Sequence, residues 1–141
     1  MTAGSPMRVH HVVFCLQPEN LERASALWTE WGLAFHELDL DDLGVRVLID
    51  WQSGIELLAP RPDAGPEAAA FVTFLDERGE GVYSVVMGVS EVDGPAAVAS
   101  RYGVPAAYEQ RRDHGGLHLE EIMLAPFHGM PVTLLSTDPP L

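Results

Sequence analysis

One strand-like segment of this chain occurs twice. Val9–Leu16 reads VHHVVFCL and Val82–Val89 reads VYSVVMGV, with valines at equivalent positions. In the second copy, Tyr83–Ser84 stands where the first has the histidine pair His10–His11. Self-similarity at a fixed separation indicates a duplicated structural unit, so the chain is expected to fold as two similar halves.

The segments that follow the two copies come in the same order. An amphipathic helical pattern is first, and strand-like runs separated by turn residues follow it. We therefore predict an α+β fold of two tandem βαβββ modules, residues 8–59 and 82–136, joined by a linker helix in residues 60–81. The strand-like runs after the helices are residues 34–40, 44–51 and 54–60 in the first module and 104–110, 116–124 and 130–136 in the second.

Composition narrows the class of protein. A chain of 141 residues, 47% of them hydrophobic, is expected to bury one core, so residues 8–136 are predicted to form a single domain with flexible ends at 1–7 and 137–141. A net charge of −13 disfavours nucleic acid as a partner. No apolar run approaches the roughly 18 residues of a membrane span, and the single cysteine forms no internal disulfide. The sequence contains no lysine, which excludes Schiff-base catalysis. We expect a cytoplasmic protein.

The paired βαβββ pattern resembles that of the vicinal oxygen chelate superfamily. A histidine near the start of the first strand and IELL (Ile55–Leu58) at the end of the first module belong to the resemblance, which covers residues 8–136. The stretch FLDERGEGVYSVVMGVSEVD, residues 74–93, is most similar to methylmalonyl-CoA epimerases, which have His-His where this chain has Tyr83–Ser84. The resemblance implies a cupped half-barrel-like sheet and a homodimer.

The same resemblance implies a divalent metal held by one residue from the first and last strands of each module. These positions fall on His11, Glu56, Ser84 and Thr133. Only His11 and Glu56 are good metal ligands, and catalytic zinc usually has three protein ligands. The sequence therefore predicts a partial metal site. The residues that could restore a ligand are His118, Glu121, His114 and His128.

Strand periodicity groups the candidate residues. Because side chains alternate along a strand, His11 shares a face with Val13 and Cys15, and Glu56 shares one with Leu58. A carboxylate inside an apolar strand is costly unless it is paired or protonated. We therefore expect Glu56 either to be protonated or to bond to His11, and the resemblance puts Ser84 and Thr133 at the equivalent places in the second module.

Two adjacent arginines open a further possibility. The segment EQRRDHGG places Arg111 and Arg112 beside His114. The pair is interpreted either as part of a solvated hairpin or as a clamp for a carboxylate or phosphate. No phosphate-binding loop or nucleotide motif occurs, so no nucleotide cofactor is expected.

Three functional hypotheses remain. The leading one is an isomerase or lyase that binds a small acyl thioester or keto acid and moves a proton next to its carbonyl. Glu56 would be the base and His11 its partner. The substrate pocket would include Ser84, Thr133, His118 and Glu121. The alternatives are a non-catalytic protein that binds or sequesters a small ligand, and a metal-dependent dioxygenase, which needs a third good ligand.

Overall fold

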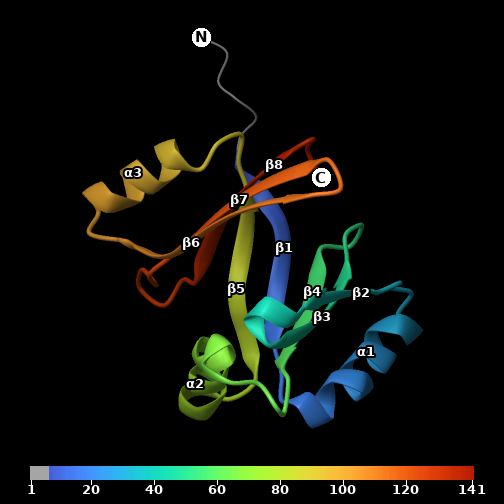
Figure 1. Ribbon diagram of the computed structural model, residues 1–141. Coiled ribbons are helices and arrows are strands. Elements are labelled where there is room, and N and C mark those ends of the chain that lie inside the picture. Colours follow the sequence, from blue (N-terminus) through green and yellow to red (C-terminus); the bar gives the residue numbers. More distant parts are fainter. Residues whose placement is uncertain (1–6) are drawn as a thin grey trace. The chain divides into compact units, whose positions relative to one another are not determined.

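The computed structural model describes residues 7–141, apart from the side chains of Asp39 and His114. Figure 1 follows the chain from blue to red through the predicted order of elements. The first module comprises β1 (Arg8–Cys15), α1 (Leu21–Glu30), β2 (His36–Leu40), β3 (Val45–Asp50) and β4 (Ile55–Pro60), with short 3₁₀ turns at Pro18–Asn20 and Asp41–Leu43.

The linker and the second module continue the pattern. A 3₁₀ turn at Pro66–Ala68 leads into α2 (Ala69–Arg78), which is the linker helix. The second module comprises β5 (Gly81–Gly88), α3 (Asp93–Arg101), β6 (Ala106–His114), β7 (Leu117–Leu124) and β8 (Val132–Asp138). No helix among the described residues has the length and apolar character that a membrane span requires.

The described residues group into two compact units, which are treated separately below. One is residues 11–83, and the other is residues 84–141 together with residues 7–10. The division passes through β1 and β5, so each long strand contributes to both units.

The unit of residues 11–83 is built on the strand order β2-β3-β4-β1. Strand β3 runs antiparallel to β2 and β4, whereas β4 runs parallel to β1. One sheet face packs against α1 through Leu21, Leu48 and Leu57. The other face buries further apolar side chains of β3 and β4, such as Ile49 and Leu58. Burial on both faces explains why β3 and β4 read as nearly continuous apolar runs.

The second unit follows the order β5-β8-β7-β6. Strand β8 runs parallel to β5 and antiparallel to β7, and β7 runs antiparallel to β6. Val92, Ile122 and Leu134 form its buried cluster, and Ala96 of α3 packs against them. Thr133 and Leu135 alternate with Leu134 and therefore lie on the face away from α3.

The two modules have the same register. In the first, Val13 of β1 lies beside Glu56 of β4, and in the second, Val86 of β5 lies beside Thr133 of β8. His11 and Ser84 each lie two residues before the paired valine, so the predicted equivalence of the two modules is confirmed at the level of register. The structure confirms the α+β class with two βαβββ modules.

Strands β6 and β8 continue past their predicted ends. Strand β6 continues to His114, past the predicted end at residue 110, because every residue from Tyr108 to His114 pairs with β7. Strand β8 continues to Asp138 because Thr137 and Asp138 pair with β7. The first two residues of the predicted flexible end, Thr137 and Asp138, therefore belong to β8. Residues 1–6, also predicted to be flexible, lie outside the described residues.

Candidate functional site

The first candidate pair lies on β1 and β4. His11 Nε2 is 3.3 Å from Glu56 Oε1, and the two side chains are 7% and 14% exposed. They share a sheet face because Val13, two residues after His11, lies beside Glu56. On its other side Glu56 lies beside Ile49, which is fully buried. The structure therefore brings together the two residues expected to pair, in an otherwise apolar setting.

Such a pair can exchange a proton internally. The carboxylate accepts protons only, whereas the imidazole can donate from one ring nitrogen and accept at the other. Water is largely excluded from both side chains. A buried carboxylate–imidazole contact of this kind is suited to general acid–base chemistry.

Trp51 lies against this pair and was not recognised as a site residue from the sequence. Its indole ring packs edge-on against the His11 imidazole, with ring centroids 5.9 Å apart and planes at 81°. The sequence pattern extended the third strand through Trp51, but β3 ends at Asp50. The dipeptide Asp50–Trp51 before Gln52–Ser53–Gly54 was the available signal, because Asp readily ends a strand by capturing nearby amides.

The Asp50 carboxylate fixes that turn. It accepts hydrogen bonds from the backbone amides of Ala34 (3.0 Å), Gln52 (2.9 Å) and Ser53 (3.2 Å). These amides, Ala34 first, hold the pKa of Asp50 below its usual value. The carboxylate is therefore charged at neutral pH and keeps the turn that carries Trp51 in place.

The second candidate pair lies on β5 and β8. The hydroxyl oxygens of Ser84 and Thr133 are 2.7 Å apart, and the two residues are 3% and 4% exposed. Either hydroxyl can be the donor. Because the contact consumes one hydroxyl proton, the accepting hydroxyl keeps its own proton for a ligand. The pair is thus a buried hydrogen-bonding element without formal charge.

The remaining candidates divide between the two faces of the strands in the second unit. Met123 lies beside Thr133 and Glu121 lies beside Leu135, so Glu121 shares the face of Thr133. His118 is an odd number of residues from Glu121 along β7 and lies on the opposite face. The expectation that His118 joins Ser84 and Thr133 is therefore wrong, because strand alternation turns its side chain to the α3 side.

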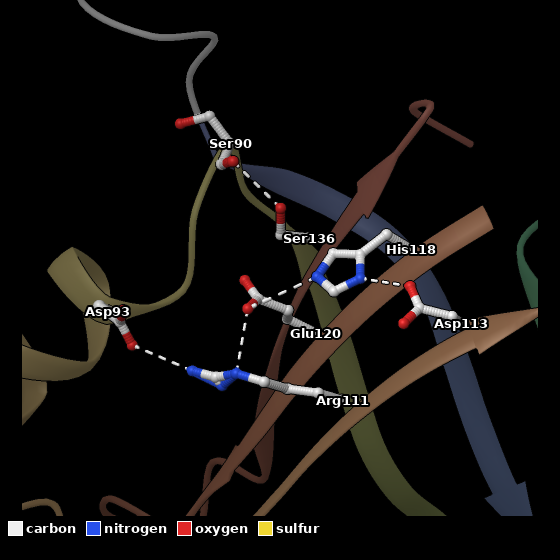
Figure 2. A network of polar contacts seen from close by, with 7 residues as sticks. All are labelled: Ser90, Asp93, Arg111, Asp113, His118, Glu120 and Ser136. Carbon is white, nitrogen blue, oxygen red and sulfur yellow. Dashed lines mark hydrogen bonds and ion pairs between the residues drawn. The ribbon is translucent and has the colours of Figure 1, made fainter. Parts of the chain in front are cut away.

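Figure 2 shows where His118 lies instead. Its Nδ1 is 2.6 Å from Asp113 Oδ1, and its Nε2 is 3.7 Å from Glu120 Oε1. Arg111 joins the network, with its Nε 3.0 Å from Glu120 and its Nη2 3.8 Å from Asp93 at the start of α3. The hydrogen bond with Asp113 is the main reason that the pKa of His118 is raised.

The two adjacent arginines point to different faces. Arg111 belongs to the network of Figure 2, whereas Arg112 Nε donates to Gln110 Oε1 at 2.7 Å. Strand alternation thus separates the proposed two-arginine clamp. The side chain of His114 lies outside the described residues. His128 follows β7 in a loop, where its ring centroid is 4.4 Å from that of Phe127.

The donor set does not fit the metal that the resemblance implies. Among the side chains that the structure describes, which exclude those of Asp39 and His114, no group of three or more His, Cys, Asp or Glu is arranged to hold a metal ion. His11 and Glu56 provide two good ligands, while Ser84 and Thr133 provide neutral hydroxyls already bonded to each other. Catalytic zinc and non-haem iron sites typically need three protein ligands.

Solved structures resemble this chain over nearly its whole length. A methylmalonyl-CoA epimerase in complex with methylmalonyl-CoA and NH4+ is 25% identical, with 94% of this chain and 95% of that one covered at a TM-score of 0.69. A variant of the Streptomyces coelicolor methylmalonyl-CoA epimerase, in complex with 2-nitronate-propionyl-CoA, is 25% identical over 92% and 93% at a TM-score of 0.68. The Mycobacterium tuberculosis enzyme of that name is 25% identical over 91% and 86% at a TM-score of 0.59. No protein-family model and no curated protein matches the sequence.

The Ser84–Thr133 hydrogen bond predicts strong coupling between these residues. Ser84→Ala or Thr133→Val alone leaves a buried hydroxyl without this partner and should lower the free energy of unfolding by about 1–3 kcal/mol. The double variant should lose clearly less than the sum, because no hydroxyl is then stranded. Urea denaturation measures all four proteins, with Thr73→Val on exposed α2 as control. Additive losses would contradict the contact.

The His118–Asp113 contact predicts a measurable titration. Asp113 stabilises the charged imidazolium of His118, so the contact adds to the stability of the fold at pH values below the ordinary histidine pKa of about 6.5. This contribution to stability is lost as the pH rises through the raised pKa of His118. Asp113→Asn should return the pKa of His118 toward its ordinary value, as followed by NMR of the ring Cε1 proton. Asp63→Asn is the control. An unchanged titration in Asp113→Asn would show that the contact does not form in solution.

Proposed function

We propose that this chain, which has the glyoxalase-like fold of the vicinal oxygen chelate superfamily, is an enzyme that moves a proton next to a carbonyl group. The buried His11–Glu56 contact carries the proposal. The similarity to methylmalonyl-CoA epimerases supports an epimerase-like activity in the broad sense.

Glu56 is assigned the role of base. Its carboxylate takes the proton from the carbon next to the carbonyl, and the electron pair of that C–H bond moves into the enolate. Return of a proton to the other face gives an epimer, and expulsion of a leaving group gives a lyase product. His11 orients the carboxylate and shares the proton, which offsets the cost of a charge in an apolar setting.

Ser84 and Thr133 are assigned to hydrogen bonding with the substrate. A developing enolate oxygen is stabilised by donors already in place before the reaction. The hydroxyl proton not used in the Ser84–Thr133 contact is suited to this role. The side chain of Glu121, on the same face as Thr133, would line the pocket.

A small acyl thioester is the favoured substrate class. The structural relatives include an epimerase bound to methylmalonyl-CoA. A keto acid is the second candidate, since it offers the same acidic carbon next to a carbonyl. In both cases the reaction is the removal of a proton from the carbon next to the carbonyl, a step for which Glu56 needs no redox cofactor.

Replacement of Glu56 tests the proposal. Glu56→Gln keeps the shape and hydrogen bonding of the side chain but cannot accept the proton, so exchange of the substrate's carbon-bound proton with D2O should fall by about 10²–10⁴-fold. Ligand binding should remain within a few-fold. NMR with methylmalonyl-CoA and with 2-oxobutyrate measures the exchange. His11→Ala should weaken binding and exchange and lower stability.

The control is Glu30→Gln, an exposed position at the end of α1. Exchange in Glu56→Gln at the parent rate would contradict the role of Glu56. Tight stoichiometric binding without exchange in the parent protein would instead favour the alternative, a protein that binds or sequesters a small ligand.

The donor set predicts weak metal binding. With only His11 and Glu56 as good ligands, protein purified without added metal and dialysed against a chelator should retain well under one equivalent of zinc, cobalt, nickel, manganese or iron. Elemental analysis measures this. One retained equivalent would show that other residues complete the site and, if the metal is iron, would favour the dioxygenase alternative.

A further inference from the structure

We propose that Trp51 is a positioning residue that holds the His11 imidazole in the orientation that serves Glu56. The inference deepens the function proposed above and rests on it for its catalytic consequence. Its structural part, the fixed imidazole, stands on the contact between the two rings and can be tested without any substrate.

The ring geometry is the first support. The Trp51 and His11 centroids are 5.9 Å apart at 81°, an edge-to-face arrangement that aromatic rings prefer. The imidazole torsion is otherwise broad, with two roughly equivalent ring orientations. Contact with a large rigid ring on one side and Glu56 at Nε2 on the other restricts this torsion. The ring nitrogen that meets the carboxylate is thereby selected.

Trp51 is partly exposed where it packs against the buried His11. The residue is 40% exposed, whereas the His11 side chain is only 7% exposed. Part of the indole therefore contacts water while another part packs against the imidazole. Limiting the access of water strengthens the electrostatic interaction within the pair.

The backbone around Trp51 is tied to the strand that carries His11. The Gly54 amide donates to the Asp50 carbonyl at 2.9 Å, and the Val12 amide, next to His11, donates to the Gly54 carbonyl at 2.9 Å. Together with the amides that Asp50 captures, these bonds fix Trp51 and His11 in one local framework. Their contact therefore does not depend on a mobile loop.

The position of Trp51 is unusual for a residue whose role is only packing. Tight turns favour Gly, Asn, Asp and Ser, and a half-exposed tryptophan in such a turn adds little to a core. Trp28 and Trp31 differ, because they pack against each other, and Trp28 also packs against Phe14. The Trp51 ring instead contacts His11, the histidine of the candidate pair.

Three variants test the inference: Trp51→Ala, Trp51→Phe and, as matched control, Trp31→Ala, which removes a tryptophan that is 65% exposed. Trp51→Ala should lower kcat for proton exchange on the order of tenfold or more and leave KM within about threefold, because orientation is lost rather than binding. Trp51→Phe retains a ring and should recover most of kcat. Trp31→Ala should match the parent.

The second readout is independent of activity. Long-range 1H–15N NMR of the imidazoles should show one fixed tautomer for His11 in the parent, in Trp51→Phe and in Trp31→Ala, and averaging between tautomers in Trp51→Ala. Circular dichroism confirms that each variant is folded. If Trp51→Ala does not fold, the decision rests on Trp51→Phe and a second variant, Trp51→Leu, which keeps apolar bulk without a ring.

The outcomes separate the two proposals. A fixed His11 tautomer in Trp51→Ala, or in Trp51→Leu if Trp51→Ala does not fold, would overturn the positioning role, whatever the activity. If His11 averages between tautomers in Trp51→Ala but the parent protein shows no proton exchange on a substrate, Trp51 positions His11 and the proposed function fails. If both readouts change together and Trp51→Phe restores them, the inference holds in full.

Discussion

The parallel pairing of β1 with β4 is the constraint on which the candidate site depends. It sets Val13 beside Glu56 and thereby brings the His11 and Glu56 side chains to one face, 3.3 Å apart. A slip of one residue would move Glu56 to the face that packs against α1, among apolar side chains. The apolar residues around Glu56 and the polar pair therefore specify the same register.

The sequence predicted the residues whose placement depends on one strand or on the repeat. The resemblance to the vicinal oxygen chelate superfamily assigned the positions of His11, Glu56, Ser84 and Thr133, and alternation along each strand placed them on one face. His118 was misplaced because its face relative to Thr133 depends on the register between β7 and β8. That register is set by pairing across a loop, which single-strand periodicity does not reveal.

Hydrogen bonds from backbone amides to a side chain were the second feature that the periodicity of the sequence did not predict. The apolar run before Gln52 suggested a strand through Trp51, but the Asp50 carboxylate binds three amides and ends β3 one residue earlier. The displaced Trp51 then contacts His11 instead of continuing the sheet. Strand β6 shows the converse error, because pairing with β7 carries it through a charged run that resembles a loop.

The two buried pairs occupy equivalent positions in the two modules, but one pair is ionisable and the other is neutral. One is an imidazole and a carboxylate, and the other is two neutral hydroxyls. The contact between the two members of each pair lies within one unit. After a duplication, one half could therefore exchange both members of its pair while the other kept its chemistry. A contact whose two members lie in one half can change as a pair, and this allows the two halves to diverge.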